Sequence, residues 1–327
     1  MIFKCRNCGG NIVYEPGRGQ MYCPHCESLN SEDIVRDDTM TVCGNCGAPI
    51  SPGKYASSGK CEHCGSYIVF EERVSDIFEP HLILPFKVNK NMAVDALEKE
   101  FHKRTFTPSG FLSRKSLEYM EGIYVPFWMY DYQAHYDFAG QGTKIRKWRS
   151  GNMEYTETSY YDIYRKMEAD FDKVPVDASF RMDDGEMDLM EPYTYQALEE
   201  FNPKYMSGFS GEVYNQSAPE LEGRAQVKVR RASDSLLQES LQGYATVTPG
   251  HKNLNLERNG IHYALMPVWQ YLYQYNGNTY RFHVNGQTGK VVGKTPVSIG
   301  KVLIYSLTTM VSASAIVSLL LAIAEVL

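Results

Sequence analysis

The fold of the N-terminal region is decided by two stretches of sequence, CRNCGGNIVYEPGRGQMYCPHC at residues 5–26 and CGNCGAPISPGKYASSGKCEHC at residues 43–64. Each stretch contains two CxxC pairs separated by fourteen residues, and the second repeats the first at an offset of thirty-eight residues. Together they hold all eight cysteines of the chain, which are Cys5, Cys8, Cys23, Cys26, Cys43, Cys46, Cys61 and Cys64. The pattern is an internal repeat of one small unit.

The spacing of these cysteines is typical of zinc ribbons. A tetrahedral Zn²⁺ needs four thiolates; one CxxC turn supplies two, and about 15–20 intervening residues allow a hairpin to return with the other two. We therefore predict two Zn²⁺ ions as cofactors, one bound by the first four cysteines and one by the last four. Gly9, Gly47 and Gly65 directly follow a cysteine and fit the tight turn of such a knuckle.

The alternative for these cysteines is thiol redox chemistry. Cys23-Pro24-His25-Cys26 alone is similar to the active-site turn of a thiol oxidoreductase, where a histidine and a helix lower the pKa of a thiol. Such a site needs a strand before it and a helix after it, whereas polar residues flank this turn and a partner CxxC lies upstream. The sequence therefore favours zinc. His25 and His63 lie inside complete CxxC turns, and we interpret them as surface residues rather than ligands.

The composition bounds the setting of the protein. The chain has 327 residues, enough for two or three domains, and a net charge of −6, which gives no general attraction to polyanions. The first residues contain no apolar stretch typical of a secretory signal. Eight cysteines at zinc spacing indicate a reducing compartment, so we expect the ribbons to lie in the cytoplasm.

The fold class that we predict is α+β, in five segments. These are zinc ribbon 1 at 1–38, zinc ribbon 2 at 39–70, a linker at 71–80, an aromatic-rich domain at 81–300 and a transmembrane helix at 302–324. A polar joint that ends in Asp37 and Asp38 separates the ribbons. Each ribbon is too small to bury a useful core, so metal binding would supply its folding free energy, about 10–16 kcal/mol per site.

Periodicity predicts the elements of the aromatic-rich domain. We expect a helix at 92–104 capped by Asn91, an acidic helix and loop on a solvated surface at 183–200, and an amphipathic helix at 217–242. The expected strands are 122–138, a hairpin of 144–148 and 154–164 around Ser150-Gly151-Asn152, and strands 263–273 and 279–284 around the turn Asn276-Gly277.

A second, weaker repeat lies inside this domain. Pro126-Phe127-Trp128-Met129-Tyr130-Asp131-Tyr132 matches Pro267-Val268-Trp269-Gln270-Tyr271-Leu272-Tyr273 as P-x-W-x-Y-x-Y. The period of two places the tryptophan and both tyrosines on one face of a strand. Two copies predict a duplicated β/α module with a shared aromatic core. An aromatic binding groove is the alternative, and core packing is favoured because aromatic side chains on one strand face usually pack inward.

The segment 302–324 contains no charged residue over twenty-three positions. At ~1.5 Å per residue, a helix of this length spans a hydrocarbon core of about 30 Å. Lys290, Lys294 and Lys301 precede it, and positive flanks stay inside, so we predict a single-pass cell-membrane protein with its N-terminal bulk in the cytoplasm. A buried core helix is the alternative.

A stripe of small residues on this segment predicts self-association. Ser314, Ser318 and Ala322 recur every four residues, as in helix pairs that pack closely within a membrane, which would give a homo-oligomer. The alternative is a serine hydroxyl bonded to its own helix backbone, and this reading is slightly favoured.

The sequence contains no catalytic constellation, and we predict that the protein is not an enzyme. HExxH and GxSxG motifs are absent, and the glycine-rich stretch 289–295 has one residue too few for a phosphate loop. Residues 1–70 carry six basic and seven acidic side chains, a balance of −1, and each zinc with four thiolates adds about −2. Nucleic-acid binding needs a concentrated positive face, so the ribbons are better suited to docking protein.

The chain resembles a bacterial family of membrane-associated double-zinc-ribbon proteins. The four CxxC knuckles carry the resemblance, together with Tyr124-Val125-Pro126-Phe127-Trp128, Met266-Pro267-Val268-Trp269 and Val284-Asn285-Gly286-Gln287-Thr288-Gly289-Lys290-Val291. Members are often described as TFIIB-type zinc ribbons or helicase-like. Some are encoded beside phage-shock-protein-A-like and SPFH or virion-core-like proteins, which implies a role in envelope stress and in recruiting partners to the membrane.

These observations converge on a membrane-anchored zinc-ribbon adaptor. We expect cytoplasmic or membrane-associated protein partners, and contact with the lipid bilayer through residues 302–324. The alternative is a nucleic-acid-binding or helicase-associated zinc-ribbon protein, which a salt-dependent DNA-binding assay would distinguish.

Overall fold

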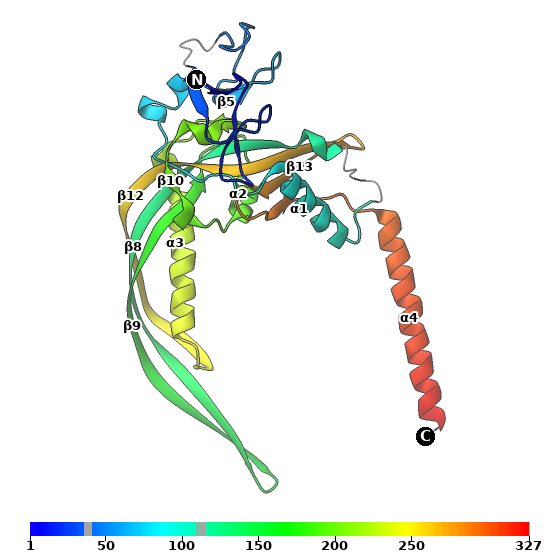
Figure 1. Cartoon of the computed structure of the whole chain (residues 1–327). Helices are drawn as coiled ribbons and strands as arrows, with labels where there is room; N and C mark the ends of the chain where they lie inside the picture. Colours follow the sequence, from blue (N-terminus) through cyan, green and yellow to red (C-terminus); the bar gives the residue numbers. More distant parts are fainter. Residues whose placement is uncertain (36–40, 109–110, 112–115, 327) are drawn as a thin grey trace.

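A computed structural model describes residues 1–326 except 36–40, 109–110 and 112–115 (Figure 1). The N-terminal ribbons lie at one end of the molecule, a broad sheet follows, and two long projections extend from the sheet toward the opposite end (Figure 1). The predicted joint residues Asp37 and Asp38, and the predicted boundary between the ribbons, lie outside the described residues.

The ribbons are built from short antiparallel strands. In ribbon 1, β1 (Ile2–Cys5) pairs with β4 (Glu32–Val35), and β2 (Val13–Glu15) pairs with β3 (Gln20–Tyr22). In ribbon 2, β5 (Ala56–Lys60) pairs with β6 (Tyr67–Val69). The predicted linker contains two single 3₁₀ turns, η1 (Glu71–Arg73) and η2 (Asp76–Phe78).

A ten-stranded sheet forms the body of the protein. Its main path runs β10-β7-β12-β8-β11-β5-β6, with β9 beside β8, β13 beside β12, and β14 beside β13. The strands outside the ribbons are β7 (Leu82–Ile83), β8 (Glu121–Ser150), β9 (Met153–Asp177), β10 (Glu199–Glu200), β11 (Ser210–Glu212), β12 (Thr246–Tyr275), β13 (Asn278–Asn285) and β14 (Val291–Gly293). The mostly sheet architecture with separate helices agrees with the α+β class. Strands β8 and β12 each run for 30 residues, much longer than the strands expected at 122–138 and 263–273.

The two P-x-W-x-Y-x-Y segments lie side by side in this sheet. Strands β8 and β12 are antiparallel, with Pro126 opposite Leu265 and Pro267 opposite Tyr124, so the two prolines take equivalent places. Each segment also has an equivalent parallel neighbour, because β11 pairs with β8 and β7 pairs with β12. The register therefore relates the two segments by an approximate two-fold axis.

The two tryptophans repeat this symmetry in their hydrogen bonds. Trp128 donates its indole N–H to the carbonyl oxygen of Gln216 at 2.9 Å, and Trp269 donates to that of Val88 at 2.8 Å. Each of these carbonyl groups immediately precedes the cap residue of a helix, Ser217 or Asn89. Trp128 on β8 therefore contacts the start of the α-helix that precedes β12, and Trp269 on β12 contacts the start of the α-helix that precedes β8. These hydrogen bonds hold the two segments together.

The aromatic side chains of these segments pack into the interior. Tyr130, Tyr132, Trp269 and Tyr271 are buried, and Trp128 is half-buried against the same clusters. The core interpretation of the P-x-W-x-Y-x-Y repeat therefore holds, and the side chains form no open aromatic groove.

Helix α1 (Lys90–Lys103) occupies the expected position but has a different cap. The side chain of Asn89 accepts a hydrogen bond from the N–H of Met92 at 3.0 Å, so the expected cap at Asn91 is wrong. Asn91 lies in the first turn because the helix begins two residues earlier than predicted. Asn89 has the extended backbone that a cap residue requires.

Helix α3 (Ala218–Ser240) supports one of the projections. Its buried residues include Leu221, Ala225, Val229 and Leu237, spaced at four or eight residues along one face. This face covers the curved ribbon of β8, β9 and β12, which we call the arm (Figure 1). Glu220 completes the helix start by accepting a hydrogen bond from the N–H of Ser217 at 2.7 Å.

The acidic stretch 183–200 forms helix α2 (Asp184–Met190) followed by a loop, as expected, but its surface is not simply solvated. Asp188 lies 2.7 Å from the Lys228 ammonium, and Asp184 lies 2.9 Å from the Arg224 guanidinium on α3. Arg224 also contacts the buried Asp177 at 2.8 Å, and burial raises the pKa of Asp177 to about 6 despite this partner. The acidic side chains therefore join α2 to α3 and to the end of β9.

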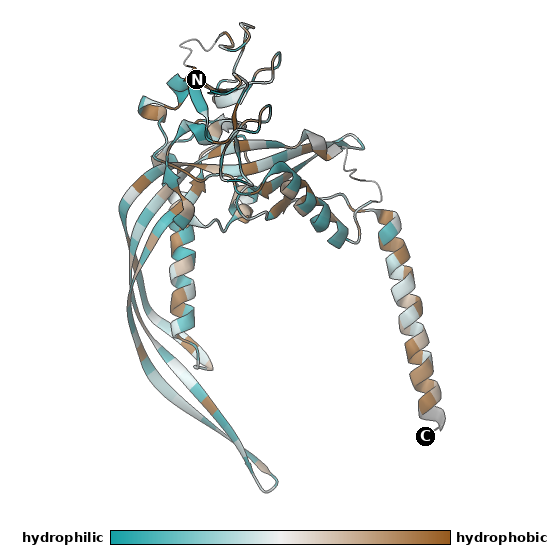
Figure 2. Cartoon of the chain, in the orientation of Figure 1, coloured by the Kyte–Doolittle hydropathy of each residue, from teal (hydrophilic) through white to brown (hydrophobic). Residues whose placement is uncertain are grey.

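Helix α4 (Ile299–Val326) is the second projection (Figure 1). It contains the predicted span 302–324, its apolar character is visible in Figure 2, and the 25 residues Ile299–Ile323 are long and apolar enough to cross a membrane. The most apolar part of this helix is not buried inside the structure, so α4 is not a core helix of this chain. Ser312 and Thr309 donate their hydroxyl groups to carbonyl oxygens of their own helix, and the stripe of small residues stays a prediction.

Candidate metal centres

The structure brings each predicted set of four cysteines together. In ribbon 1 the sulfur atoms of Cys5 and Cys26 are 3.6 Å apart, as are those of Cys8 and Cys23. In ribbon 2 the equivalent separations are 3.7 Å and 3.9 Å. All four sulfur atoms of a set lie within 4.8 Å of one another. Four thiolates at about 2.3 Å from a tetrahedral Zn²⁺ are separated by roughly 3.8 Å, so both sets fit a zinc ion.

Each site is held by two similar backbone turns, four in the two sites together. The N–H of Gly9 bonds to the carbonyl oxygen of Cys5, and the equivalent bonds run from Glu27 to Cys23, Gly47 to Cys43 and Gly65 to Cys61. Gly9, Gly47 and Gly65 have positive φ values of 71°, 71° and 73°, which confirms why glycine follows the cysteine there. Glu27 occupies the fourth position with φ of 61°, a conformation that a side chain rarely adopts.

The first cysteine of each pair is buried, and the second faces outward. Cys5, Cys23, Cys43 and Cys61 are at most 2% exposed, whereas Cys8, Cys26 and Cys46 are exposed. Each ion would therefore sit at the boundary between a small core and solvent, which is the usual position of a structural zinc. His25 and His63 are exposed on the knuckles, as expected, and the metal-ligating clusters in the described part of the chain consist of cysteines.

Hydroxyl groups next to the sulfur atoms favour the thiolate form that a metal requires. The Ser31 hydroxyl, 3.2 Å from the sulfur of Cys5, lowers the pKa of that thiol to about 5. Burial raises the pKa of Cys64, but hydrogen bonds from Ser66 and Asn45 outweigh it and bring the value to about 5. A hydrogen bond from Ser28 also lowers the pKa of Cys26. Each site thus holds at least one thiol that ionises readily.

One further thiol of each site, that of Cys8 or Cys46, resists ionisation because its pKa is raised. The N–H of Gly10 lowers the pKa of Cys8, but the neighbouring sulfur atoms and burial together outweigh this effect and raise the pKa to about 12. A bound dication removes this conflict because it stabilises all four thiolates together. A bound cation would therefore balance the charge of the four thiolates, and a Cys₄ set is soft enough to suit zinc.

A polar network links the two sites. Lys4 of ribbon 1 donates to the amide oxygen of Asn11 at 2.8 Å and also to that of Asn45 in ribbon 2. Asn11 and Asn45 both donate to the hydroxyl oxygen of Ser66, at 2.7 Å and 2.8 Å. Ser66 is fully buried and lies 3.2 Å from the sulfur of Cys64. Hydrogen bonds from ribbon 1 therefore end beside a ligand of the second site.

Sequence reasoning missed these supporting residues, although the thirty-eight-residue offset contains a signal for them. Asn7 donates to the Ser28 hydroxyl in ribbon 1 at 2.8 Å, and the offset maps this pair onto Asn45 and Ser66. An asparagine inside a CxxC turn and a serine two residues after a CxxC turn thus recur with the ligands. Ser31 has no such repeat, and its contact with Cys5 depends on the path of the chain after the second CxxC turn of ribbon 1.

The redox alternative for Cys23-Pro24-His25-Cys26 does not fit its surroundings. The turn follows the short antiparallel strand β3 and is followed by a bridge and strand β4, instead of the helix that an oxidoreductase turn requires. The sulfur atoms of Cys23 and Cys26 face the partner pair, Cys5 and Cys8, at 3.6 Å. The geometry is that of a shared metal site.

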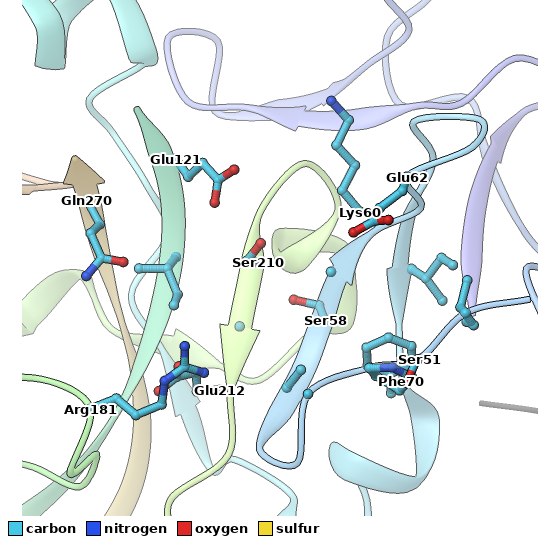
Figure 3. A pocket seen from close by; sticks show the side chains of 18 of the residues that line it. Ser51, Ser58, Lys60, Glu62, Phe70, Glu121, Arg181, Ser210, Glu212 and Gln270 are labelled. Atoms are coloured by element: carbon cyan, nitrogen blue, oxygen red, sulfur yellow. The ribbon is translucent and has the colours of Figure 1, made fainter. Parts of the chain in front are cut away.

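A cleft of about 500 Å³ lies beside the second site, where ribbon 2 meets the sheet (Figure 3). Strands β5, β11 and β8 contribute to its wall, and its charged residues are Lys60, Glu62, Glu121, Arg181 and Glu212. Glu212 is buried, forms an ion pair with Arg181 at 2.9 Å and accepts a hydrogen bond from the Ser179 hydroxyl at 2.8 Å. The other charged groups remain available on the rim.

The fold and the site define a protein with two Cys₄, zinc-ribbon-like sites and a separate apolar helix at the other end of the chain. The chain is 34% identical over 311 residues to the uncharacterized protein YdjG of Bacillus subtilis (strain 168), covering 92% of this chain and 91% of YdjG, and it belongs to the same family. No protein-family profile matches the chain, and no solved structure does either.

Proposed function

We propose that the protein is a membrane-anchored zinc-ribbon adaptor that recruits cytoplasmic proteins to the membrane. The observation that carries this proposal is the separation of two features. The Cys₄ ribbons lie at one end of the molecule, and the apolar helix α4, which is exposed beyond its first turns, extends away from them (Figure 1). A helix with this exposure needs a lipid environment, and insertion there leaves the ribbons free to meet a second protein.

The cleft between ribbon 2 and the sheet is the surface that best suits a protein partner. Its volume of about 500 Å³ lies within the range of ligand-binding clefts, about 300–1,000 Å³. Its rim carries both signs of charge, with Lys60 beside Glu62 and with Glu121 on the opposite wall (Figure 3). A peptide segment with charges of both signs would complement such a rim, and the zinc site would hold the ribbon wall in place.

The proposal also covers the class of partner, the duplicated module and the side of the membrane on which the ribbons lie. Partners that resemble phage-shock protein A, or SPFH and virion-core-like proteins, would place the adaptor in an envelope stress response. The equivalent tryptophan hydrogen bonds support a duplicated β/α module as the scaffold between ribbons and anchor. The lysines before α4 support a cytoplasmic position for the ribbons.

Nucleic-acid binding by the ribbons is the competing proposal. The balance of six basic and seven acidic side chains in residues 1–70 disfavours it, and two zinc sites with four thiolates each bring this balance to about −5. Recognition of phosphate groups needs a positively charged surface. Salt-dependent binding of duplex DNA at physiological ionic strength would favour this competitor.

The test uses the full chain and charge reversal at the cleft rim. Membranes containing the wild-type protein should retain a phage-shock-protein-A-like or SPFH partner added in purified form, and the double variant E62K/E121K should retain much less. The double variant K87E/K99E is a control for charge reversal elsewhere on the surface, because both lysines are exposed on or beside α1 and neither lines the cleft. Equal retention by all three proteins would contradict the proposed docking surface.

A further inference from the structure

The end of the arm is an isolated two-stranded ribbon. The pairing of β12 with β8 begins at Thr246 opposite Thr143, and α3 ends at Ser240. Beyond that point, residues 144–159 pair, in the part of the chain that the structure describes, only with one another. At ~3.3 Å per residue this ribbon, which we call the tip, extends about 23 Å past its last neighbouring strand. A two-stranded ribbon alone is marginally stable in water, so the tip needs an external surface.

The tip is rich in basic residues. One strand reads Lys144-Ile145-Arg146-Lys147-Trp148-Arg149, with four cations in six residues, and the other strand contributes Glu154 and Glu157. The register places Glu157 opposite Arg146 and Glu154 opposite Arg149, whereas Lys144 faces Ser159 and Lys147 faces Thr156. The net charge of the tip is therefore about +2, on a chain whose total charge is −6.

Exposed aromatic and apolar side chains accompany this charge. Trp148 is 44% exposed, Met153 65% and Tyr155 40%. The rings of Trp148 and Tyr155 stack with centroids 5.5 Å apart, and the Arg146 guanidinium lies 5.7 Å from the indole. The other two tryptophans of the chain donate hydrogen bonds within the core, so Trp148 is the one placed at the surface. Tryptophan and tyrosine with neighbouring cations are typical of residues at a membrane interface.

We propose that the tip binds the surface of an anionic lipid bilayer, as a second membrane contact besides α4. The proposal rests on the proposed membrane anchor. The lysine and arginine side chains would meet lipid phosphate groups, and Trp148, Tyr155 and Met153 would enter the headgroup region. The arm and α4 project from the same side of the sheet, away from the ribbons, so a bilayer that receives α4 also faces the tip (Figure 1).

The contacts of α4 allow both elements to reach one bilayer. The described contacts between α4 and the body lie at its start: Ser298 N–H to Phe106 oxygen at 2.8 Å, Lys301 ammonium to Thr107 oxygen at 2.7 Å, and the Tyr305 ring against Phe106. The arm, in contrast, is continuous with the central sheet. A charged ribbon cannot enter hydrocarbon, so α4 tilts about residues 294–298 on insertion, and the tip rests on the surface.

Hydrogen exchange of the full chain in lipid nanodiscs tests the proposal. Discs of phosphatidylcholine alone are compared with discs that also contain phosphatidylglycerol, and exchange is read in residues 144–159. In anionic discs the wild-type tip should exchange about tenfold more slowly than in neutral discs, and K144E/K147E should abolish this protection. The control K87E/K99E makes the same charge change off the arm and should keep the protection.

The outcomes separate the tip from the anchor. Co-elution with both kinds of disc, but unchanged exchange of the tip, would overturn the lipid contact and leave the anchor intact. Failure to co-elute with either disc would overturn the anchor, and the tip proposal with it. Protection of the tip by duplex DNA or RNA, but not by anionic discs, would replace the lipid by a nucleic acid. If the tip of K144E/K147E were protected by anionic discs as strongly as the wild-type tip, the proposed attraction between its lysines and lipid phosphates would be wrong.

Discussion

Ribbon 1 and ribbon 2 share one cysteine pattern but attach to the body in different ways. The strands of ribbon 1 pair with one another, and its side chains Phe3, Ile12 and Met21 enter the largest buried cluster together with residues of the central sheet. Ribbon 2 instead continues the sheet, because β5 pairs with β11. Its own small cluster contains Ile68 and Phe70 and receives Ile2 from ribbon 1.

The difference teaches that residues outside the cysteines decide how a ribbon is attached. Strand β5 approaches β11 closely because Ser57, Ser58 and Gly211 are small, and the Ser58 hydroxyl donates to the carbonyl oxygen of Phe209 at 3.0 Å. Ribbon 1 has bulky apolar side chains at the positions that face the body. The sheet therefore runs across the predicted boundary after residue 70, and the boundary itself stays a prediction.

The largest expected effect comes from removing a metal ligand. Cys8→Ser and Cys46→Ser change exposed cysteines, so little packing is lost, and each protein should hold one zinc ion instead of two. Because metal binding supplies about 10–16 kcal/mol to a ribbon, the affected ribbon should unfold. Native mass spectrometry counts the zinc ions.

Hydrogen exchange then distinguishes the two attachments. Loss of zinc in Cys46→Ser should increase exchange in β5 and β11, whereas Cys8→Ser should increase exchange in β1 to β3 and spare β11. A wild-type protein that holds less than one zinc per chain, with disulfides in its place, would contradict both metal sites.

A smaller effect separates the two cores. Phe3→Ala should lower the free energy of unfolding of the body by about 3–5 kcal/mol, because Phe3 is buried in the cluster that ribbon 1 shares with the sheet. Phe70→Ala removes the same side chain from the small cluster of ribbon 2, and its effect should be confined to that ribbon. Thermal unfolding followed by circular dichroism measures the first effect. An equal loss of body stability in both variants would contradict the proposed difference.

Crowding the junction of ribbon 2 should give an effect of about 1–3 kcal/mol. A Cβ atom at Gly211 would lie 2.6 Å from the Ser57 hydroxyl oxygen and 2.6 Å from the terminal carbon of Met206. Gly211→Ala should therefore loosen β5 from β11 while both zinc ions stay bound. Gly53→Ala is the control, since its Cβ would meet no atom within 4 Å. Chemical denaturation measures both; no difference between them would show that the junction is not tightly packed.

The cysteine sets and many of the elements could be predicted from the sequence because their signals are local. CxxC spacing, the glycine knuckles, the Asn276-Gly277 turn and the apolar run at 302–324 each depend on a few neighbouring residues. The arm could not be predicted at its full length. Strands β8 and β12 form 23 residue pairs whose members are more than a hundred positions apart, and alternation alone does not say which strand is the partner.

The way in which each ribbon attaches to the body could not be predicted from the sequence either. Ser57, Ser58 and Gly211 are small polar or flexible residues, which read locally as a loop, and only their contact across the chain makes them a junction. The ion pairs of Arg224 with Asp177 and Asp184 were missed for the same reason, since an acidic run looks solvated until a cation from another element faces it.

The smallest expected effect compares the two asparagines that the repeat places inside CxxC turns. Asn45 donates to the Ser66 hydroxyl at 2.8 Å and to the Cys64 sulfur at 3.4 Å, and it also accepts a hydrogen bond from Lys4. Asn7, its equivalent, donates to Ser28 at 2.8 Å. Residues that orient ligands typically change metal affinity by 10–100-fold, so Asn45→Ala should weaken zinc binding at the second site by about tenfold.

Asn7→Ala should weaken the first site less, because a single hydrogen bond to a serine is lost there. Competition with a chromophoric chelator measures the affinity of each site in the same protein. The network through Lys4 and Ser66 adds one further consequence, since Asn45→Ala also removes a contact between the ribbons. If both variants weakened their own site equally, the extra bonds of Asn45 would have no part in holding the metal, and the two ribbons would differ only in how they attach to the body.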